Sequence, residues 1–128
     1  MKYLHTMLRV TDLEKSIHFY ESALGFKIVK RNDYSEGEFT LVFLRSPDDE
    51  EDGPCLELTY NWGKKKYVRG DAFGHTAFLV SSISDVQKKL KDNGYDLSWG
   101  PGAAPNGKTL IAFIDDPDGY EIELIERH

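Results

Sequence analysis

Two segments of the chain carry apolar residues at helical spacing, and strand-like runs surround each of them. The first helical segment starts at Thr11, with Glu14 placed for a capping box, and Gly25 predicts its end. The second starts at Ser82, with Asp85 in the corresponding position, and Gly94 predicts its end. Alternating or continuous apolar runs predict strands over 4–10, 26–32, 38–46, 54–62, 74–80, 95–99, 108–115 and 120–126.

The predicted elements follow the order β-α-β-β-β twice, which indicates an internal duplication. His5 and His75, each followed by threonine, lie 70 residues apart (75 − 5) in the first strand of each half. Glu57 and Glu123 each lie between two aliphatic residues in the last strand of each half. We therefore expect an α+β fold, a single domain over 1–128 made of a first module over 1–63 and a second over 71–128.

Composition limits the classes of function. The 128 residues, 40% hydrophobic and 30% charged, fit a globular domain, and no apolar run reaches the ~20 residues that a membrane-spanning helix needs. The first ten residues do not resemble a signal peptide. A single cysteine, Cys55, excludes an internal disulfide and fits a reducing, cytoplasmic location. The net charge of −6 argues weakly against nucleic-acid or acidic membrane partners.

The duplicated histidine and glutamate residues are candidate metal ligands. A single such residue on a strand most often faces solvent, but repetition at equivalent points favours a shared role. If the two halves pair around a shared cleft, the two imidazoles and two carboxylates converge. Such a set is poor for a closed structural zinc site and suits Ni, Co, Zn, Mn or Fe with open positions for substrate. A carboxylate there could abstract a proton next to a carbonyl, which makes Glu123 a ligand and a proton shuttle.

Four stretches are spread along nearly the whole chain: LHTMLRVTDLEKSIHFYESALGF, LELTYNWG, FGHTAFLV and DPDGYEIELIE. They resemble motifs of the glyoxalase I (lactoylglutathione lyase) family of the vicinal oxygen chelate superfamily. The resemblance implies a glyoxalase/bleomycin-resistance/dioxygenase-like fold, with a curved mixed sheet around a metal cleft. It also implies detoxification of methylglyoxal, through metal-dependent isomerisation of the methylglyoxal-glutathione hemithioacetal to S-lactoylglutathione by way of an enediolate. Glutathione would be the co-substrate.

The resemblance also assigns roles to individual residues. The implied metal ligands are His5, Glu57, His75 and Glu123. Glu123 would be the catalytic base, and Glu57 would assist it or act on the other substrate stereoisomer. Arg9 and Asn61 match positions that hold glutathione in the family, and a guanidinium can grip a carboxylate with two hydrogen bonds. One position departs from the pattern, because some relatives have a basic residue where this chain has Asp71; Arg69 or Lys108 could substitute, or the thiol cofactor could differ in charge.

The family resemblance favours one divalent metal per site, with nickel preferred and cobalt or zinc possible, because the chain is like the short bacterial form. It implies a homodimer with ligand pairs from different subunits, although some members close the site within one chain. Two alternatives stay open: an epimerase or lyase acting on another thiol adduct, and a metal-free drug-binding module. The Gly/Pro-rich segment 100–108 is expected to be a flexible loop that could act as a lid. Cys55, Trp62 and Trp99 are either cleft residues or ordinary packing residues.

Overall fold

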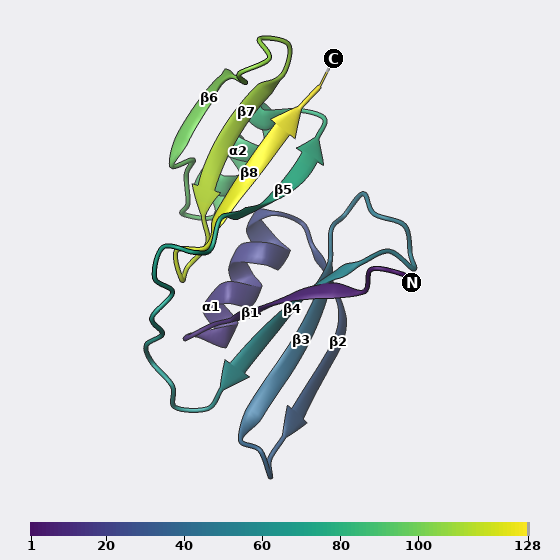
Figure 1. Cartoon of the computed structure of the whole chain (residues 1–128), viewed down its shortest axis with the longest axis vertical. Helices are drawn as coiled ribbons and strands as arrows, with labels where there is room; N and C mark the ends of the chain where they lie inside the picture. Colours follow the sequence, from purple (N-terminus) through teal and green to yellow (C-terminus); the bar gives the residue numbers. More distant parts are fainter. Residues whose placement is uncertain (128) are drawn as a thin grey trace. The chain divides into compact units, whose positions relative to one another are not determined.

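The chain divides into two compact units, Met1–Val68 and Arg69–His128. The computed structural model describes residues 1–127. The first unit contains β1 (His5–Arg9), α1 (Leu13–Ile17), η1 (His18–Ala23), β2 (Lys27–Tyr34), β3 (Phe39–Arg45) and β4 (Cys55–Asn61). The second contains β5 (His75–Val80), α2 (Ile83–Asp92), β6 (Trp99–Ala103), β7 (Leu110–Asp115) and β8 (Glu121–Glu126). The predicted α+β fold of two β-α-β-β-β modules is confirmed (Figure 1).

Each unit has one four-stranded mixed sheet, and the two sheets share the same topology. The strand order is β1-β4-β3-β2 in the first unit and β5-β8-β7-β6 in the second. In both, the first and last strands of the module pair in parallel, whereas the remaining neighbours are antiparallel. Consequently the histidine-bearing strand lies directly beside the glutamate-bearing strand within each unit.

One face of the first sheet forms a hydrophobic core with the helix of its unit. The inward-facing residues of the central strands are fully buried, as shown by Val42, Leu44 and Leu58 at 0% exposure. The helix adds Ile17 and Tyr20, also buried. Each such side chain contributes about 1.5–3 kcal/mol when removed from water. Because strand side chains alternate, this core directs the intervening residues, including Glu57, to the opposite face.

The second unit repeats this arrangement. Ile122 and Leu124 on β8 are 1% and 2% exposed, and Ile83 and Leu90 of α2 are buried as well. Figure 1 shows α2 against one face of its sheet. Glu121, Glu123 and Ile125 therefore lie on the other face of the sheet, as the alternation along β8 predicts.

The helix boundaries are partly as expected. Ser82 caps α2 by accepting a hydrogen bond from the Asp85 amide, and Gly94, at φ +87°, follows the helix, so both predictions are confirmed. The predicted cap at Thr11 is wrong, because Asp12 accepts the hydrogen bond from the Lys15 amide instead, at 3.1 Å. Carboxylate caps serve as well as hydroxyl caps, and the two neighbouring candidates were indistinguishable by type. No helix within residues 1–127 has the length and apolarity that crossing a membrane requires.

The strand predicted over 95–99 begins later than expected. The observed β6 covers Trp99–Ala103, so part of the segment expected to be a flexible loop is paired with β7. The register shifts between Trp99 and Gly102, and Pro101, which has no amide proton, lies within this irregular stretch. Gly100 has φ +91°, and a side chain there would meet the Ile111 carbonyl oxygen at 2.9 Å. Glycine and proline thus allow this bulged strand rather than prevent it.

Candidate metal centre

The first unit brings His5 and Glu57 together on the face opposite its core. The Nε2 atom of His5 lies 3.1 Å from Oε1 of Glu57. Nitrogen and oxygen ligands bind a divalent transition metal at about 2.0–2.2 Å, so two adjacent ligands of one ion lie about 3.0–3.4 Å apart. The separation of the pair therefore fits two neighbouring positions of a coordination sphere.

Glu57 is held at both of its oxygens. It is a buried carboxylate, 8% exposed, and Thr59 Oγ1 donates a hydrogen bond to its Oε2 at 2.9 Å. Thr59 is itself buried and follows Glu57 by two residues on the same face of β4. A buried carboxylate needs such partners, because an unpaired charge away from water is costly. The hydroxyl therefore stabilises Glu57 in the orientation that turns Oε1 towards His5.

The second unit contains the corresponding pair, His75 and Glu123, in a looser arrangement. Nε2 of His75 lies 4.0 Å from Oε2 of Glu123, and Nδ1 lies 3.9 Å from Oε1 of Glu121. The His75 side chain is 41% exposed and that of Glu123 is 18% exposed. Metal-binding imidazoles commonly have a carboxylate near the ring nitrogen that does not bind the metal. Glu121 lies in this position, which the sequence interpretation did not assign.

A phenylalanine lies against each histidine, and neither was singled out from the sequence. The rings of His5 and Phe43 meet edge to face with centroids 5.5 Å apart, and those of His75 and Phe113 with centroids 5.7 Å apart. Phe43 pairs in register with Glu57, and Phe113 with Glu123. The spacing between the phenylalanines is 70 (113 − 43), equal to that between the histidines, so the repeat could have revealed them.

The donor set is divided evenly between the two units. Among residues 1–127 no group of three or more His, Cys, Asp or Glu side chains is close enough to hold a metal ion. Each unit by itself offers one imidazole nitrogen and one carboxylate oxygen. Taken as a set, these nitrogen and oxygen donors suit a divalent transition metal with open positions. The convergence of all four on one ion remains a prediction.

The two predicted substrate-binding residues lie near Glu57 in the first sheet. Arg9 is on the same face as Glu57, and Asn61 is at the end of the strand that carries Glu57. Arg9 pairs in register with Thr59, which places it two positions along β1 from Met7, the partner of Glu57. Asn61, the last residue of β4, donates a hydrogen bond from Nδ2 to the Tyr67 hydroxyl at 2.9 Å. This contact fixes the orientation of the Asn61 amide.

Arg69 and the two tryptophans each have a defined contact. The Arg69 guanidinium lies over the Tyr120 ring, 5.0 Å from its centroid. Trp99 packs edge to face on Phe113, so it borders the His75 face of the second sheet. Trp62, which is 40% exposed, donates a hydrogen bond from Nε1 to Thr40 Oγ1 at 2.8 Å, and this contact holds its ring against β3.

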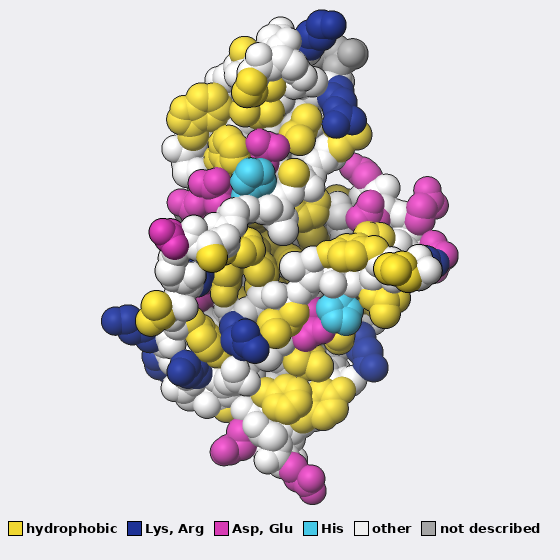
Figure 2. Space-filling view, in the orientation of Figure 1, with side chains coloured by type: hydrophobic (Ala, Val, Ile, Leu, Met, Phe, Trp, Pro, Cys, Tyr) yellow, Lys and Arg dark blue, Asp and Glu magenta, His cyan; other side chains and the backbone are white. Residues whose placement is uncertain are grey.

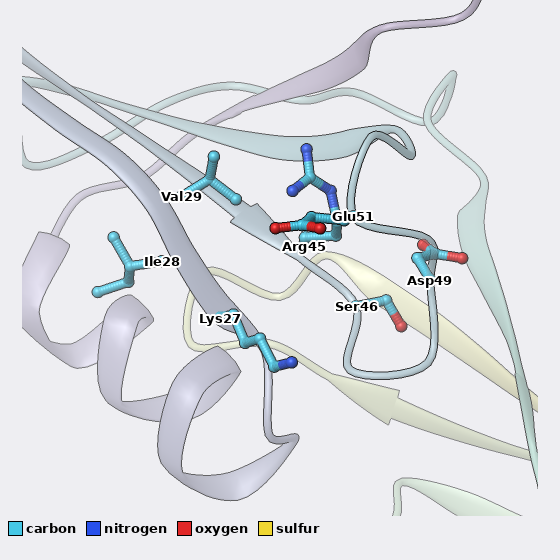
Figure 3. Close-up of a pocket in the computed structure, with 7 residues that line it drawn as sticks. All are labelled: Lys27, Ile28, Val29, Arg45, Ser46, Asp49 and Glu51. Carbon is cyan, nitrogen blue, oxygen red and sulfur yellow. The ribbon is translucent and has the colours of Figure 1, made fainter.

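The first unit also has a cavity of about 450 Å³ away from the predicted ligands. Figure 3 shows its lining residues Lys27, Ile28, Val29, Arg45, Ser46, Asp49 and Glu51. Arg45 connects this cavity to the ligand strand, because its Nε donates to the Gly53 carbonyl and its Nη2 lies 3.4 Å from Cys55 Sγ. The half-buried Cys55 is therefore a packing partner of Arg45 on the Glu57 face.

The surface in Figure 2 shows histidine side chains beside acidic ones, with hydrophobic side chains around them.

Comparison with known proteins places the chain in a family. Residues 2–124 match the model of the Glyoxalase/Bleomycin resistance protein/Dioxygenase superfamily, and the chain belongs to this superfamily. The duplicated β-α-β-β-β module agrees with that assignment.

Several of the similar proteins are lactoylglutathione lyases or glyoxalases I. The lactoylglutathione lyase of Neisseria meningitidis serogroup A is 46% identical over 127 residues, covering 99% of this chain and 91% of the relative. Glyoxalase I from Zea mays has a TM-score of 0.91 and 36% identity; the alignment covers 98% of this chain but only 44% of the maize chain. The trypanothione-dependent glyoxalase I of Leishmania major has a TM-score of 0.82 and 37% identity, with 98% and 86% coverage.

Proposed function

We propose that the protein is a lactoylglutathione lyase, which converts the hemithioacetal of methylglyoxal and glutathione to S-lactoylglutathione. The observation that carries this proposal is the equivalent His–Glu pair of each module, His5 with Glu57 and His75 with Glu123. The near full-length similarity to lactoylglutathione lyases supports it. The side chains of His5 and His75 are 39% and 41% exposed, whereas the ligands of a structural metal site are closed off from solvent. This exposure favours a site that binds substrate.

The four side chains together would hold one divalent metal. A bound divalent ion supplies Lewis-acid stabilisation of the negative charge that develops on the substrate oxygens. Four protein donors would leave such an ion able to bind substrate oxygens as well.

The proton transfer is assigned to the chain's own carboxylates. Glu123 takes the proton from the carbon that carries sulfur, which gives an enediolate, and returns a proton to the neighbouring carbonyl carbon. The hydroxyl proton moves in the same direction, from the oxygen on the carbon that carries sulfur to the oxygen of the neighbouring carbon, and the product is a thioester with an adjacent hydroxyl group. One carbon is oxidised and its neighbour is reduced, so no external oxidant or reductant is needed. Glu57, whose Oε2 accepts the hydrogen bond from Thr59, assists from its ligand position. Phe43 and Phe113 pack against the imidazole rings of His5 and His75.

Substrate binding is assigned to Arg9 and Asn61. The guanidinium of Arg9 binds a glutathione carboxylate, since a planar fork matches the two carboxylate oxygens. Asn61, oriented by Tyr67, hydrogen-bonds to the peptide part of the same thiol. Asp71 is acidic and cannot bind a second carboxylate of the thiol cofactor. The Arg69 guanidinium is stacked on the Tyr120 ring, so Lys108 is the proposed substitute for the basic residue.

The remaining parts of the proposal concern the metal, the assembly and the compartment. Nickel is the proposed metal, with cobalt or zinc as substitutes that the same nitrogen and oxygen donors accept. We propose a homodimer in which His5 and Glu57 of one subunit share a metal site with the second-module pair, equivalent to His75 and Glu123, of the other subunit. The proposed location is the cytoplasm, where glutathione is kept reduced.

Turnover by reconstituted apoprotein tests the proposal. Metal is removed by chelation, nickel or zinc is added back separately, and formation of the thioester from methylglyoxal and glutathione is followed by absorbance. Recovery with nickel to a higher rate than with zinc is expected, and chelation should abolish it. Equal activity in the apoprotein, or turnover only with another thiol, would contradict the assignment. The variant Lys88→Ala, at an exposed position of α2, serves as a matched surface control for handling of the protein.

A further inference from the structure

The two modules differ at one position beside their carboxylates. Thr59 follows Glu57 by two residues on β4, and Ile125 follows Glu123 by two residues on β8. Both positions pair with the fifth residue of the parallel neighbouring strand, Arg9 in β1 and Leu79 in β5. They are therefore equivalent in the duplicated fold. One side chain has a hydroxyl group and the other is purely aliphatic.

This difference changes how each carboxylate is held. Glu57 has contacts at both oxygens, His5 Nε2 at 3.1 Å and Thr59 Oγ1 at 2.9 Å, so rotation of its carboxylate would break one of them. In the part of the chain that the structure describes, the carboxylate of Glu123 has a single contact, to His75 Nε2 at 4.0 Å. It is also the more exposed of the two side chains, 18% against 11%.

We propose that Thr59 is a positioning residue that assigns different tasks to the two carboxylates. Its hydroxyl keeps Glu57 as a fixed ligand, and the lack of a hydroxyl at Ile125 leaves Glu123 able to turn from the ligand position towards the substrate. Symmetric ligands would otherwise compete for the role of base. This inference rests on the proposed function but concerns residues that the function does not itself assign.

Three variants separate this role from simple packing. Thr59→Val keeps the shape and removes the hydroxyl, Thr59→Ser keeps the hydroxyl, and Ile125→Thr adds one beside Glu123. Partners that orient a metal ligand commonly change metal affinity by about 10–100-fold when removed. Nickel affinity is measured by competition with a chromophoric chelator, on the full-length protein, alongside kcat and KM.

Thr59→Val is expected to bind nickel about 10–100-fold more weakly, and Thr59→Ser to stay near the parent value. Ile125→Thr is expected to bind nickel at least as tightly as the parent, while kcat falls about tenfold or more with little change in KM, because Glu123 becomes fixed. Parent-like affinity in Thr59→Val, an equal loss in Thr59→Ser, or parent-like kcat in Ile125→Thr would each overturn the positioning role.

The affinity measurements do not depend on turnover, so the two proposals can fail separately. If the parent protein binds nickel but does not isomerise the hemithioacetal, the proposed function fails, and the affinity of Thr59→Val still decides the positioning role. If the parent is active and Thr59→Val binds nickel as the parent does, the positioning role fails and the function stands. If the parent binds no metal, both are overturned.

Discussion

Asp116 should be a main stabilising residue of the turn that leads into β8, and its removal should lower stability measurably. Its Oδ1 accepts hydrogen bonds from the amides of Asp118 and Tyr120, each at 2.9 Å, and its side chain is 4% exposed. Hydrogen bonds to a charged acceptor contribute about 1.5–3 kcal/mol each. The Asp118 amide is only partly buried, so water can replace its partner. We therefore expect Asp116→Ala to lower the free energy of unfolding by about 3 kcal/mol.

This loss corresponds to a fall in melting temperature of about 10 °C for a chain of this size. Asp116→Asn retains an acceptor oxygen without the charge and should lose about half as much. The matched control is Asp115→Asn, an exposed neighbouring carboxylate, which should change stability by less than about 0.5 kcal/mol. Urea unfolding followed by tryptophan fluorescence measures all three. Equal stability of Asp116→Ala and Asp115→Asn would refute the reasoning.

Two further predictions test the assembly and the substrate contacts. Mixing Glu57→Gln with Glu123→Gln after unfolding and refolding together should restore about a quarter of parent activity if ligand pairs meet across a twofold dimer; mixing Glu57→Gln with His5→Gln should restore none. Recovery in both mixtures, or in neither, would contradict the shared interface. Arg9→Ala should raise KM for the glutathione adduct about tenfold or more with a smaller change in kcat, and an unchanged KM in steady-state assays would remove Arg9 from substrate binding.

The repeat made the fold, and the pairing of the strands that carry the predicted ligands, predictable from the sequence. Hydrophobic alternation placed Ile122 and Leu124 in the core, and this left Glu123 on the opposite face. The matching residues at a fixed offset then indicated that His5 and His75 are equivalent. Core burial and duplication are properties of residue order along the chain, so sequence patterns carry them directly.

Other features depended on contacts that residue order does not contain. The irregular pairing of β6 arises from how Gly100 and Pro101 fit against β7, whereas their composition suggested a loop. The hydrogen bond from Thr59 to Glu57 depends on the rotation of both side chains, which the order of residues does not specify. Glu121 was assigned to a strand face correctly, but its closeness to Nδ1 of His75 depends on the imidazole orientation. The pattern of faces is thus predictable, while the partners within each face are not.

Titration of the apoprotein with nickel, in the parent and in two variants, tests the shared site most directly. If both His–Glu pairs bind the same ion, the parent takes up one tightly bound nickel per chain, and Glu57→Gln and Glu123→Gln each weaken that single event. Calorimetry and metal analysis give the stoichiometry independently of catalysis. Uptake of two ions per chain, with each variant removing only one of them, would show that the pairs act separately and would contradict the account.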